Sequence, residues 1–483
     1  MGKKRHRKKT NEYRQHRQHK RWGKRRKERL ATGISSINGY KGSTVEDDTI
    51  AIQRVKWIEN DFDHKQEKGE HSDADKVTSN EVITSKEFFE RFVAERKPVV
   101  ISGLPESKEW GLSKWRGDEG LGYFISRAGD CEVKVECKSS QGHFGAGLPK
   151  RQLKFREFIG LLRKGETQHY LTTQANEEDC VVAPPANMLK GDFPDRPALL
   201  GNLISHRINL WMGSSSHGTS SGLHHDFHDN LYLLVRGKKR FTLFSPIDTE
   251  RMYTHGKPTK IFWNGLIDYE PCRSGANRRA DGAHKAEVAN FKLSEANENL
   301  QQLEAKENVA HDEIEAAEAK VNACMEEMLE VGIDGDDDTH QRDSGSGSRI
   351  DDDEDAKGVS SHPDSFSKIA VGELRGFVEK GIIPASHPLI QHTKPLVVTV
   401  EAGEMLYLPA GWFHEVTSFG AGIPFSDSES SSSPAIHIAL NYWMYPPGQR
   451  DFDHPYEDGY WDHVTKCRGI WKKEPCNPDL NNA

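Results

Sequence analysis

The chain has 483 residues, of which 35% are hydrophobic and 29% are charged, and its mean hydropathy is −0.76. This composition is too polar for one uniformly packed globule, so a compact core must coexist with solvated segments. No apolar run of about 18 residues occurs, which excludes a transmembrane span. The seven cysteines are scattered and form no C-x-x-C pair, which argues against a structural zinc module and for free thiols in a reducing compartment.

The net charge of −8 conceals a strong asymmetry along the chain. Residues 1–30 contain fifteen Lys and Arg against two Glu, a net charge of +13, so the other residues carry −21. A basic tail of this kind predicts a nuclear or nucleolar address or a contact with nucleic acid, and a cytoplasmic protein otherwise. It is not a secretory signal, because no apolar segment follows it. Residues 31–80 are mixed and acidic and are predicted to form a disordered linker.

The folded domain is predicted to span residues 82–475. Thr84 or Ser85 can cap a helix over residues 86–95, because an apolar stripe of Phe and Val follows at helical spacing. The other predicted elements of this half are a strand at 97–103, a helix at 155–163, a strand at 169–172 and an apolar stretch at 208–212.

The stretch at 223–244 is predicted to form a β-hairpin. Leu231 to Val235 is apolar, Gly237 with Lys238 can form a tight turn, and the residues after the turn favour β-structure. With a two-residue turn, period-two alternation would place one set of side chains on a single face of the hairpin. That set is His224, Asp226, Asn230 and Lys239.

Two insertions interrupt the predicted domain. Residues 283–331 contain neither Pro nor Gly and fit a seven-residue repeat, which predicts a long helix with an alanine-rich coiled-coil seam. Self-association through this helix, a helical hairpin and a lone helix lying on the core all remain open. Residues 334–365 are predicted to form an acidic disordered linker. A polar loop at 426–433 could be a phosphorylation site or a solvated loop.

Strand-like runs return after these insertions. They lie at 395–400, 405–409, 413–416 and 437–443, with turn residues between them. Many short strands separated by turns are typical of a β-barrel or a double-sheet jelly roll. The fold is therefore predicted to be mainly β, with flanking helices.

The candidate metal ligands lie far apart in the sequence. His224 and Asp226 form an H-x-D pair, which is weak evidence alone, and His414 follows a predicted barrel strand and turn. Two imidazoles and one carboxylate on neighbouring strands form the facial triad that suits Fe(II) and leaves three adjacent positions open. A four-ligand zinc site would leave no such room. His225 and His228 are competing candidates, although strand parity turns His225 to the opposite face.

The motif at Gly403–Val416, GEMLYLPAGWFHEV, together with the H-x-D stretch, resembles the JmjC-domain oxygenases of the cupin superfamily. The resemblance is closest to the small JmjC-only protein hydroxylases, particularly the lysyl hydroxylases, and it covers roughly residues 82–270 and 370–470. It implies a double-stranded β-helix fold, Fe(II), 2-oxoglutarate and O2. It also implies hydroxylation of a protein side chain, with succinate and CO2 as co-products.

Residue by residue, the resemblance makes His224, Asp226 and His414 the iron ligands and catalytic centre. Lys239 then matches the lysine that binds the distal carboxylate of 2-oxoglutarate, and a buried ammonium requires such an anion. The other matching positions are Tyr170, Ser221, Asn230 and Asn441 around the co-substrate and Trp211 at the substrate mouth. Structural roles remain open for Asn230, Asn441 and Trp211, and the register of Ser221 is open by one residue.

Three other functions share this core. A JmjC histone lysine demethylase uses the same chemistry on an N-methyl group, although many of them carry Glu where this chain has Asp226, and reader or zinc modules are not evident in the sequence. A tRNA-modifying oxygenase is compatible with the basic tail. A non-catalytic cupin scaffold is disfavoured by the intact triad. The expected partners are a protein substrate and, through residues 1–30, nucleic acid as an alternative to a targeting role; no membrane is expected.

Overall fold

The structure is a computed structural model, and it describes residues 37–45, 51–57, 81–105, 109–138, 144, 150–172, 181–270, 278–306, 309–333, 362–421 and 434–467. The predictions for the basic tail at 1–30, for the loop at 426–433 and for nearly all of the acidic linker at 334–365 lie outside these residues. None of the helices that the structure describes is long and apolar enough to cross a membrane.

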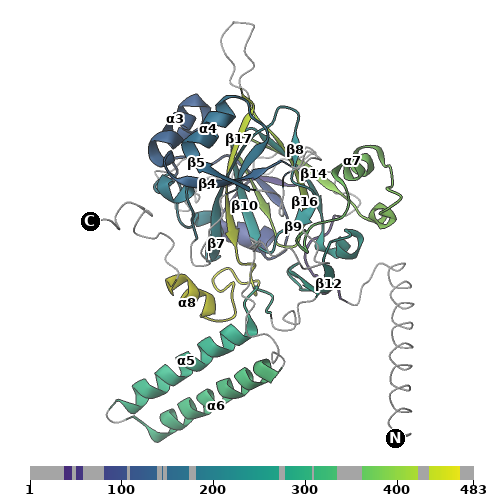
Figure 1. Cartoon of the computed structure of the whole chain (residues 1–483). Helices are drawn as coiled ribbons and strands as arrows, with labels where there is room; N and C mark the ends of the chain where they lie inside the picture. Colours follow the sequence, from purple (N-terminus) through teal and green to yellow (C-terminus); the bar gives the residue numbers. More distant parts are fainter. Residues whose placement is uncertain are drawn as a thin grey trace, which may run out of the picture.

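Two sheets form the body of the domain, as a mainly β jelly-roll requires (Figure 1). The larger sheet has ten strands in the order β2-β1-β3-β15-β10-β17-β7-β6-β4-β5. The smaller sheet has the order β14-β11-β16-β8, with β9 pairing to β16. The strands of the larger sheet are β1 (Arg54–Trp57), β2 (Val82–Ile83), β3 (Val99–Ser102), β4 (Glu132–Cys137), β5 (Lys150–Lys154), β6 (His169–Thr172), β7 (Ser205–Ser214), β10 (Asp229–Arg236), β15 (Glu404–Leu408) and β17 (Ile436–Met444). Those of the smaller sheet are β8 (Thr219–Ser220), β9 (His224–His225), β11 (Lys238–Phe244), β14 (Leu396–Glu401) and β16 (Phe413–Phe419).

Strands β10 and β11 differ from the predicted hairpin. They follow one another in sequence, but β10 pairs with β15 and β17 in the larger sheet, whereas β11 pairs with β14 and β16 in the smaller one. Gly237, at a φ of +92°, carries the chain from one sheet to the other, a conformation that glycine adopts without strain. The predicted alternation is nevertheless present, because Asn230 and Lys239 both face the space between the two sheets. The alternation of side chains along a strand indicates which face of the sheet a residue occupies. It does not show which other strand its own strand pairs with.

The two faces of the larger sheet have different partners. Leu231, Leu233 and Val235 of β10 face outward into a large apolar core, which α3 (Gly117–Ala128) and α4 (Phe155–Arg163) cover. Tyr232 and Leu234 face inward and pack against the smaller sheet. Helix α4 has the bounds that its amphipathic spacing predicts. The predicted helix near residue 86 is α2 (Ser85–Phe88) continued by a π-helical turn at Phe89–Val93, and Thr84 caps it through a capping box with Glu87.

The predicted linker at 31–80 is partly ordered, which is a correction. Residues 37–45 and 51–57 are described, and β1 pairs in parallel with both β2 and β3. Val55 is fully buried in the outer core, so this strand extends the larger sheet. The prediction of disorder rested on the acidic residues on either side of this strand. It failed because the apolar side chains Ile52 and Val55 are buried.

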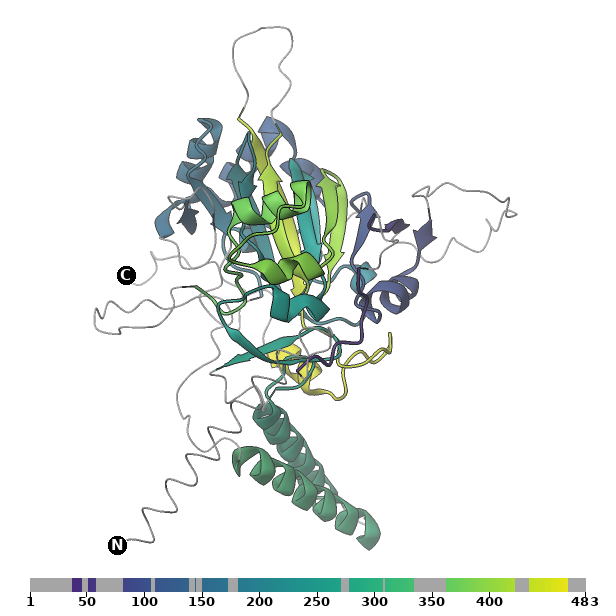
Figure 2. The ribbon, with the colours of Figure 1, turned by 90° about the vertical axis from the view of Figure 1, so that its right-hand side faces the viewer.

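The segment predicted as a long helix at 283–331 forms a helical hairpin, which is one of the arrangements that the heptad pattern left open. Its two helices, α5 (Lys285–Glu304) and α6 (His311–Ile333), pack side by side and project from the barrel (Figures 1 and 2). Ala296, Val321 and Cys324 form their small shared core, so the alanine-rich seam is used within the chain. The base of α5 packs on α8 (Tyr460–Cys467). Besides short 3-10 helices, the other described elements are β12 (Lys257–Ile261), β13 (Ile267–Glu270) and α7 (Val371–Lys380).

Candidate active site

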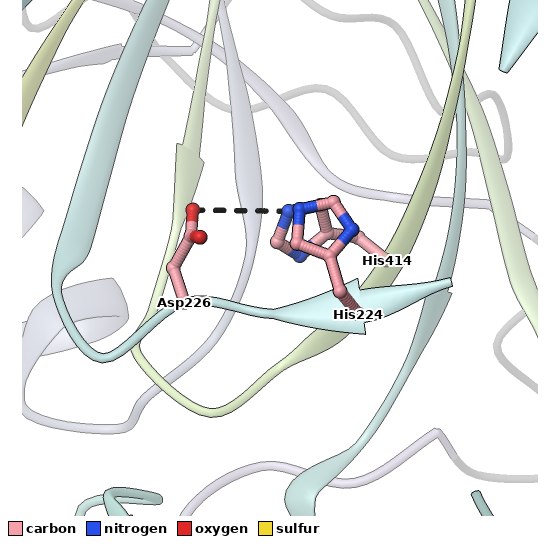
Figure 3. A group of neighbouring side chains, drawn as sticks. All are labelled: His224, Asp226 and His414. Carbon is pink, nitrogen blue, oxygen red and sulfur yellow. Dashed lines mark ion pairs between the residues drawn. The ribbon is translucent and has the colours of Figure 1, made fainter. Parts of the chain in front are cut away.

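The three predicted metal ligands meet at one end of the space between the two sheets. His224 lies in β9 directly opposite His414 in β16, and Asp226 lies in the segment between β9 and β10. Their ligand atoms all lie within 4.8 Å of one another, and Nε2 of His414 is 3.8 Å from Oδ2 of Asp226. Figure 3 shows the carboxylate facing both imidazoles. Among the described residues, this is the one such cluster of three potential ligands.

Both imidazoles are oriented by the backbone. Nδ1 of His224 lies 3.0 Å from the carbonyl oxygen of Gly222, and Nδ1 of His414 lies 3.0 Å from that of Trp412. With Nδ1–H donating to a carbonyl, Nε2 carries its lone pair toward the cluster, as a metal ligand must. Burial, and then the neighbouring His414, lower the pKa of His224 to about 4, so its ring is neutral at physiological pH. This donor set fits Fe(II), which would supply oxidation chemistry at this position.

The two competing histidines do not join the cluster. Nε2 of His225 lies 2.6 Å from the hydroxyl of Tyr269, and burial lowers the pKa of His225 to about 3. His228 stacks on His206 with ring centroids 3.9 Å apart. Strand parity therefore separated His224 from His225 correctly.

A buried ion pair that the sequence did not reveal supports the cluster. The guanidinium of Arg96 donates to both carboxylate oxygens of Asp229, at 2.8 Å from Nη1 to Oδ2, and both side chains are fully buried. The hydroxyl of Tyr407 and the backbone N–H of Ala410 also donate to Asp229, at 2.7 and 2.9 Å. Asp229 thus fixes the turn at 409–412, which precedes His414, to the segment that carries Asp226. H-x-D-x-x-D spacing was the available signal, but no local pattern identifies Arg96 as its partner.

Lys239 lies farther into the same space, at the end away from the metal ligands. Its side chain is 1% exposed, and its Nζ donates to the hydroxyl of Ser418 at 2.6 Å and to that of Tyr170 at 3.5 Å. Burial lowers the pKa of Lys239 to about 7. No carboxylate in the described part of the chain forms a salt bridge with it. A buried lysine among neutral hydroxyls fits an anionic co-substrate, because the anion would restore its charged form.

The two predicted asparagines form one buried amide network with Trp211. Nδ2 of Asn441 donates to Oδ1 of Asn230 at 2.9 Å, and Oδ1 of Asn441 accepts from the indole of Trp211 at 2.7 Å and from Asn209 at 3.1 Å. The network joins β7, β10 and β17 and fixes the orientation of each amide.

The structure places a serine other than Ser221 beside Lys239. The hydroxyl of Ser221 donates to the carbonyl of Gly222 and accepts from the backbone N–H of Val416, so it joins the end of β8 to β16. Ser418, which the sequence did not single out, is the serine that contacts Lys239. It lies four residues after His414 on β16, and period-two alternation places it on the same face.

Comparisons with known proteins agree with this geometry. A model of the cupin-like domain matches residues 85–450. JmjC domain-containing protein 4 of Schizosaccharomyces pombe is 35% identical over 439 residues, which cover 81% of this chain and 87% of that protein. Lysine-specific demethylase JMJ32 of Arabidopsis thaliana is 24% identical over 406 residues, 82% of this chain and 86% of that protein. Bifunctional peptidase and (3S)-lysyl hydroxylase JMJD7 of Homo sapiens is 26% identical over 176 residues, 34% of this chain and 52% of that protein.

The family match covers most of the chain, and it includes the strands that carry all three candidate ligands. The expected resemblance and the expected fold are both confirmed. This chain belongs to the cupin-like family and, within it, to the JmjC-domain oxygenases.

Proposed function

We propose that this protein is an Fe(II)- and 2-oxoglutarate-dependent dioxygenase that hydroxylates a side chain of a protein substrate. The observation that carries the proposal is the presence of the His-Asp-His cluster and a buried Lys239 on the same side of the smaller sheet. A chelating oxo-acid needs metal positions at one end and a cation at the other. His414 and Ser418 lie on the same face of β16, and Ser418 pairs with Lys239 of the neighbouring strand β11.

The contacts of each side chain indicate the role that it would have in the proposed reaction. His224, Asp226 and His414 would hold Fe(II), which supplies oxygen activation coupled to decarboxylation of 2-oxoglutarate to succinate and CO2. Lys239, Tyr170 and Ser418 would bind the distal carboxylate. The amide network around Asn441 keeps its own polar groups satisfied and excludes water from the wall of the pocket.

Hydroxylation is the first candidate, and lysine demethylation is the second. Asp226 as the carboxylate ligand favours a hydroxylase, and one relative is named as a (3S)-lysyl hydroxylase. Another relative, which matches much more of the chain, is named as a lysine-specific demethylase, so this alternative has an observation of its own. The metal chemistry is the same in both, because N-demethylation begins with hydroxylation of the methyl group.

The decisive experiment is co-substrate-dependent proteomics. A cell extract is treated with the wild-type chain or with His414→Ala, in the presence and absence of 2-oxoglutarate, and substrate peptides are compared by mass spectrometry. Gain of one oxygen on a side chain, dependent on both His414 and 2-oxoglutarate, supports the hydroxylase. Loss of a methyl group with formaldehyde release would establish the demethylase instead. No succinate formation by the wild type in either case would contradict the oxygenase proposal itself.

The expected partners and location stay predictions. Residues 1–30 would direct the protein to the nucleus or nucleolus or contact nucleic acid, and salt-dependent RNA retention by the full chain tests the second role. Self-association through 283–331 would have to use the outer faces of the α5–α6 hairpin. Met325 and Leu329 are 44% and 60% exposed there.

A further inference from the structure

His437 is a buried histidine at the lysine end of the proposed co-substrate pocket. It is the second residue of β17 and is 2% exposed, and its ring centroid lies 5.6 Å from that of Tyr170. Glycines on both sides make room for it. A Cβ on Gly213 would lie 2.9 Å from Cε1 of the imidazole, and a Cβ on Gly237 would lie 2.8 Å from Cβ of His437. The imidazole is therefore held closely between two backbones, beside Lys239 and Tyr170.

The polar groups of this imidazole have no protein partner to explain their burial. Nδ1 of His437 is buried and makes no hydrogen bond within the described part of the chain. An unsatisfied buried donor or acceptor is costly, so such a group calls for an explanation. Burial, and then the nearby Lys239, lower the pKa of His437 well below its ordinary value. The ring is therefore neutral and offers one N–H donor.

Lys239 and His437, which both lie beside Tyr170, thus each lack the polar partner that a buried group of their kind needs. Lys239 has no carboxylate partner, and His437 has no acceptor for its N–H, among the residues that the structure describes. Tyr170 and Ser418 beside them are neutral hydroxyls. A carboxylate has two oxygens with about four acceptor sites, so a single one can accept from several donors at once. Ser418, whose hydroxyl accepts from Lys239, lies four residues after His414 on β16, which corresponds to about 13 Å along the strand.

We propose that His437 donates a hydrogen bond to the distal carboxylate of 2-oxoglutarate beside Lys239, and so helps the site to select a dicarboxylic oxo-acid. The inference rests on the proposed function and adds a binding residue to it. The competing explanation is that the imidazole only fills the space above Gly213. The two explanations differ in which ligands lose affinity, because a hydrogen bond to the distal carboxylate matters only for ligands that possess one.

The test measures binding rather than turnover. The full chain is loaded with Mn²⁺ under exclusion of oxygen, and the affinities for 2-oxoglutarate and for oxalate are measured by isothermal titration calorimetry. Oxalate has a chelating pair of oxygens but no distal carboxylate. In His437→Ala, the affinity for 2-oxoglutarate should fall roughly tenfold, since the lost hydrogen bond has a charged acceptor. The affinity for oxalate should stay within about twofold on the same reasoning.

Further variants separate chemistry from packing. His437→Phe keeps a ring but removes both nitrogens and should behave like His437→Ala. His437→Asn and His437→Gln place an amide near the positions of Nδ1 and Nε2, and one of them should restore most of the affinity for 2-oxoglutarate. The matched control is His169→Gln on β6. Its Nδ1 is also buried without a partner, but His169 precedes Tyr170 and points to the other face of the sheet, so binding should not change.

The outcomes are distinguishable. Equal losses for 2-oxoglutarate and oxalate in the His437 variants would leave only the packing role and overturn the inference. Unchanged 2-oxoglutarate affinity in His437→Phe would do the same. A wild-type protein that binds Mn²⁺ and oxalate but not 2-oxoglutarate would instead overturn the proposed function on which the inference rests.

Discussion

The backbone N–H of Gly411 donates a hydrogen bond of 2.9 Å to the carbonyl oxygen of Asp226. The residue that carries the candidate carboxylate ligand and the turn that leads to His414 are therefore joined directly, across 185 positions of sequence. Gly411 has a φ of +77°, and a Cβ there would lie 1.8 Å from the carbonyl oxygen of Gly265. No other residue fits at this position without displacing the backbone of the neighbouring segment.

Gly411→Ala should therefore disturb the metal site and the stability of the fold together. We expect the free energy of unfolding to fall by about 2 kcal/mol or more, since both backbone strain and a steric clash are introduced. We also expect weaker Mn²⁺ binding. Gly122→Ala in α3 is the control, because a Cβ there meets nothing within 4 Å. Chemical denaturation and metal titration of both variants check the prediction, and equal behaviour of the two would contradict it.

Loss of a candidate metal ligand should weaken metal binding without unfolding the domain. His224→Ala, Asp226→Ala and His414→Ala each remove one of three donors, so metal affinity should fall by more than roughly 100-fold, beyond what loss of an outer partner costs. Succinate formation from 2-oxoglutarate should be abolished, while circular dichroism stays that of the wild type. His392→Ala, an exposed histidine, should retain both properties. Undiminished turnover in any triad variant would remove that residue from the proposed site.

Lys239→Met should have opposite effects on stability and on binding. Met keeps much of the volume while removing a charge that burial disfavours, so the protein without co-substrate should be no less stable than the wild type at pH 7. Its affinity for 2-oxoglutarate should fall by about tenfold or more, because the cation is lost. Thermal denaturation with and without 2-oxoglutarate measures both effects. Unchanged affinity would show that the carboxylate binds elsewhere.

Binding of 2-oxoglutarate should be accompanied by proton uptake. Burial lowers the pKa of Lys239 from an ordinary value of about 10.5 to about 7, so the unfolded chain binds more protons than the folded one between these pH values. Stability without co-substrate should therefore rise as the pH increases from about 7 toward 10.5. A bound carboxylate raises the pKa again, so the wild type should take up close to one proton at pH 8. Tyr170 and His437 face Lys239 and are both neutral there.

Calorimetry in buffers of different ionisation enthalpy measures this uptake directly. Lys239→Met is the matched control and should show none. Equal uptake in the wild type and in Lys239→Met would assign the proton to another group.

The buried pair of Arg96 and Asp229 should contribute far more to stability than a surface pair. Asp229→Asn leaves a fully buried guanidinium without its anion, and we expect the free energy of unfolding to fall by about 3–5 kcal/mol. Arg450 and Glu95 form an exposed pair at 3.0 Å, and Arg450→Met should cost less than about 1 kcal/mol. Urea denaturation of the two variants compares them. A small effect of Asp229→Asn would mean that the network does not hold the two turns together.

The sequence by itself determined the elements whose causes are local. The capping box at Thr84 and Glu87 and the amphipathic spacing of 155–163 place two helices, because helix formation depends on neighbours within one or two turns. The candidate metal ligands were predicted from H-x-D and the stretch at Gly403–Val416, and the structure brings these three side chains together.

Only the tertiary structure decided which segments meet. Period two assigned His224, Asn230 and Lys239 to one enclosed face, but it could not show that β10 and β11 belong to different sheets. A heptad pattern could not distinguish one long helix from α5 packed on α6. The partner of Asp229, the serine beside Lys239 and the place of His437 all depend on contacts between residues far apart in the chain. Such contacts form because the whole core buries its apolar surface at once, and no single stretch of sequence records them.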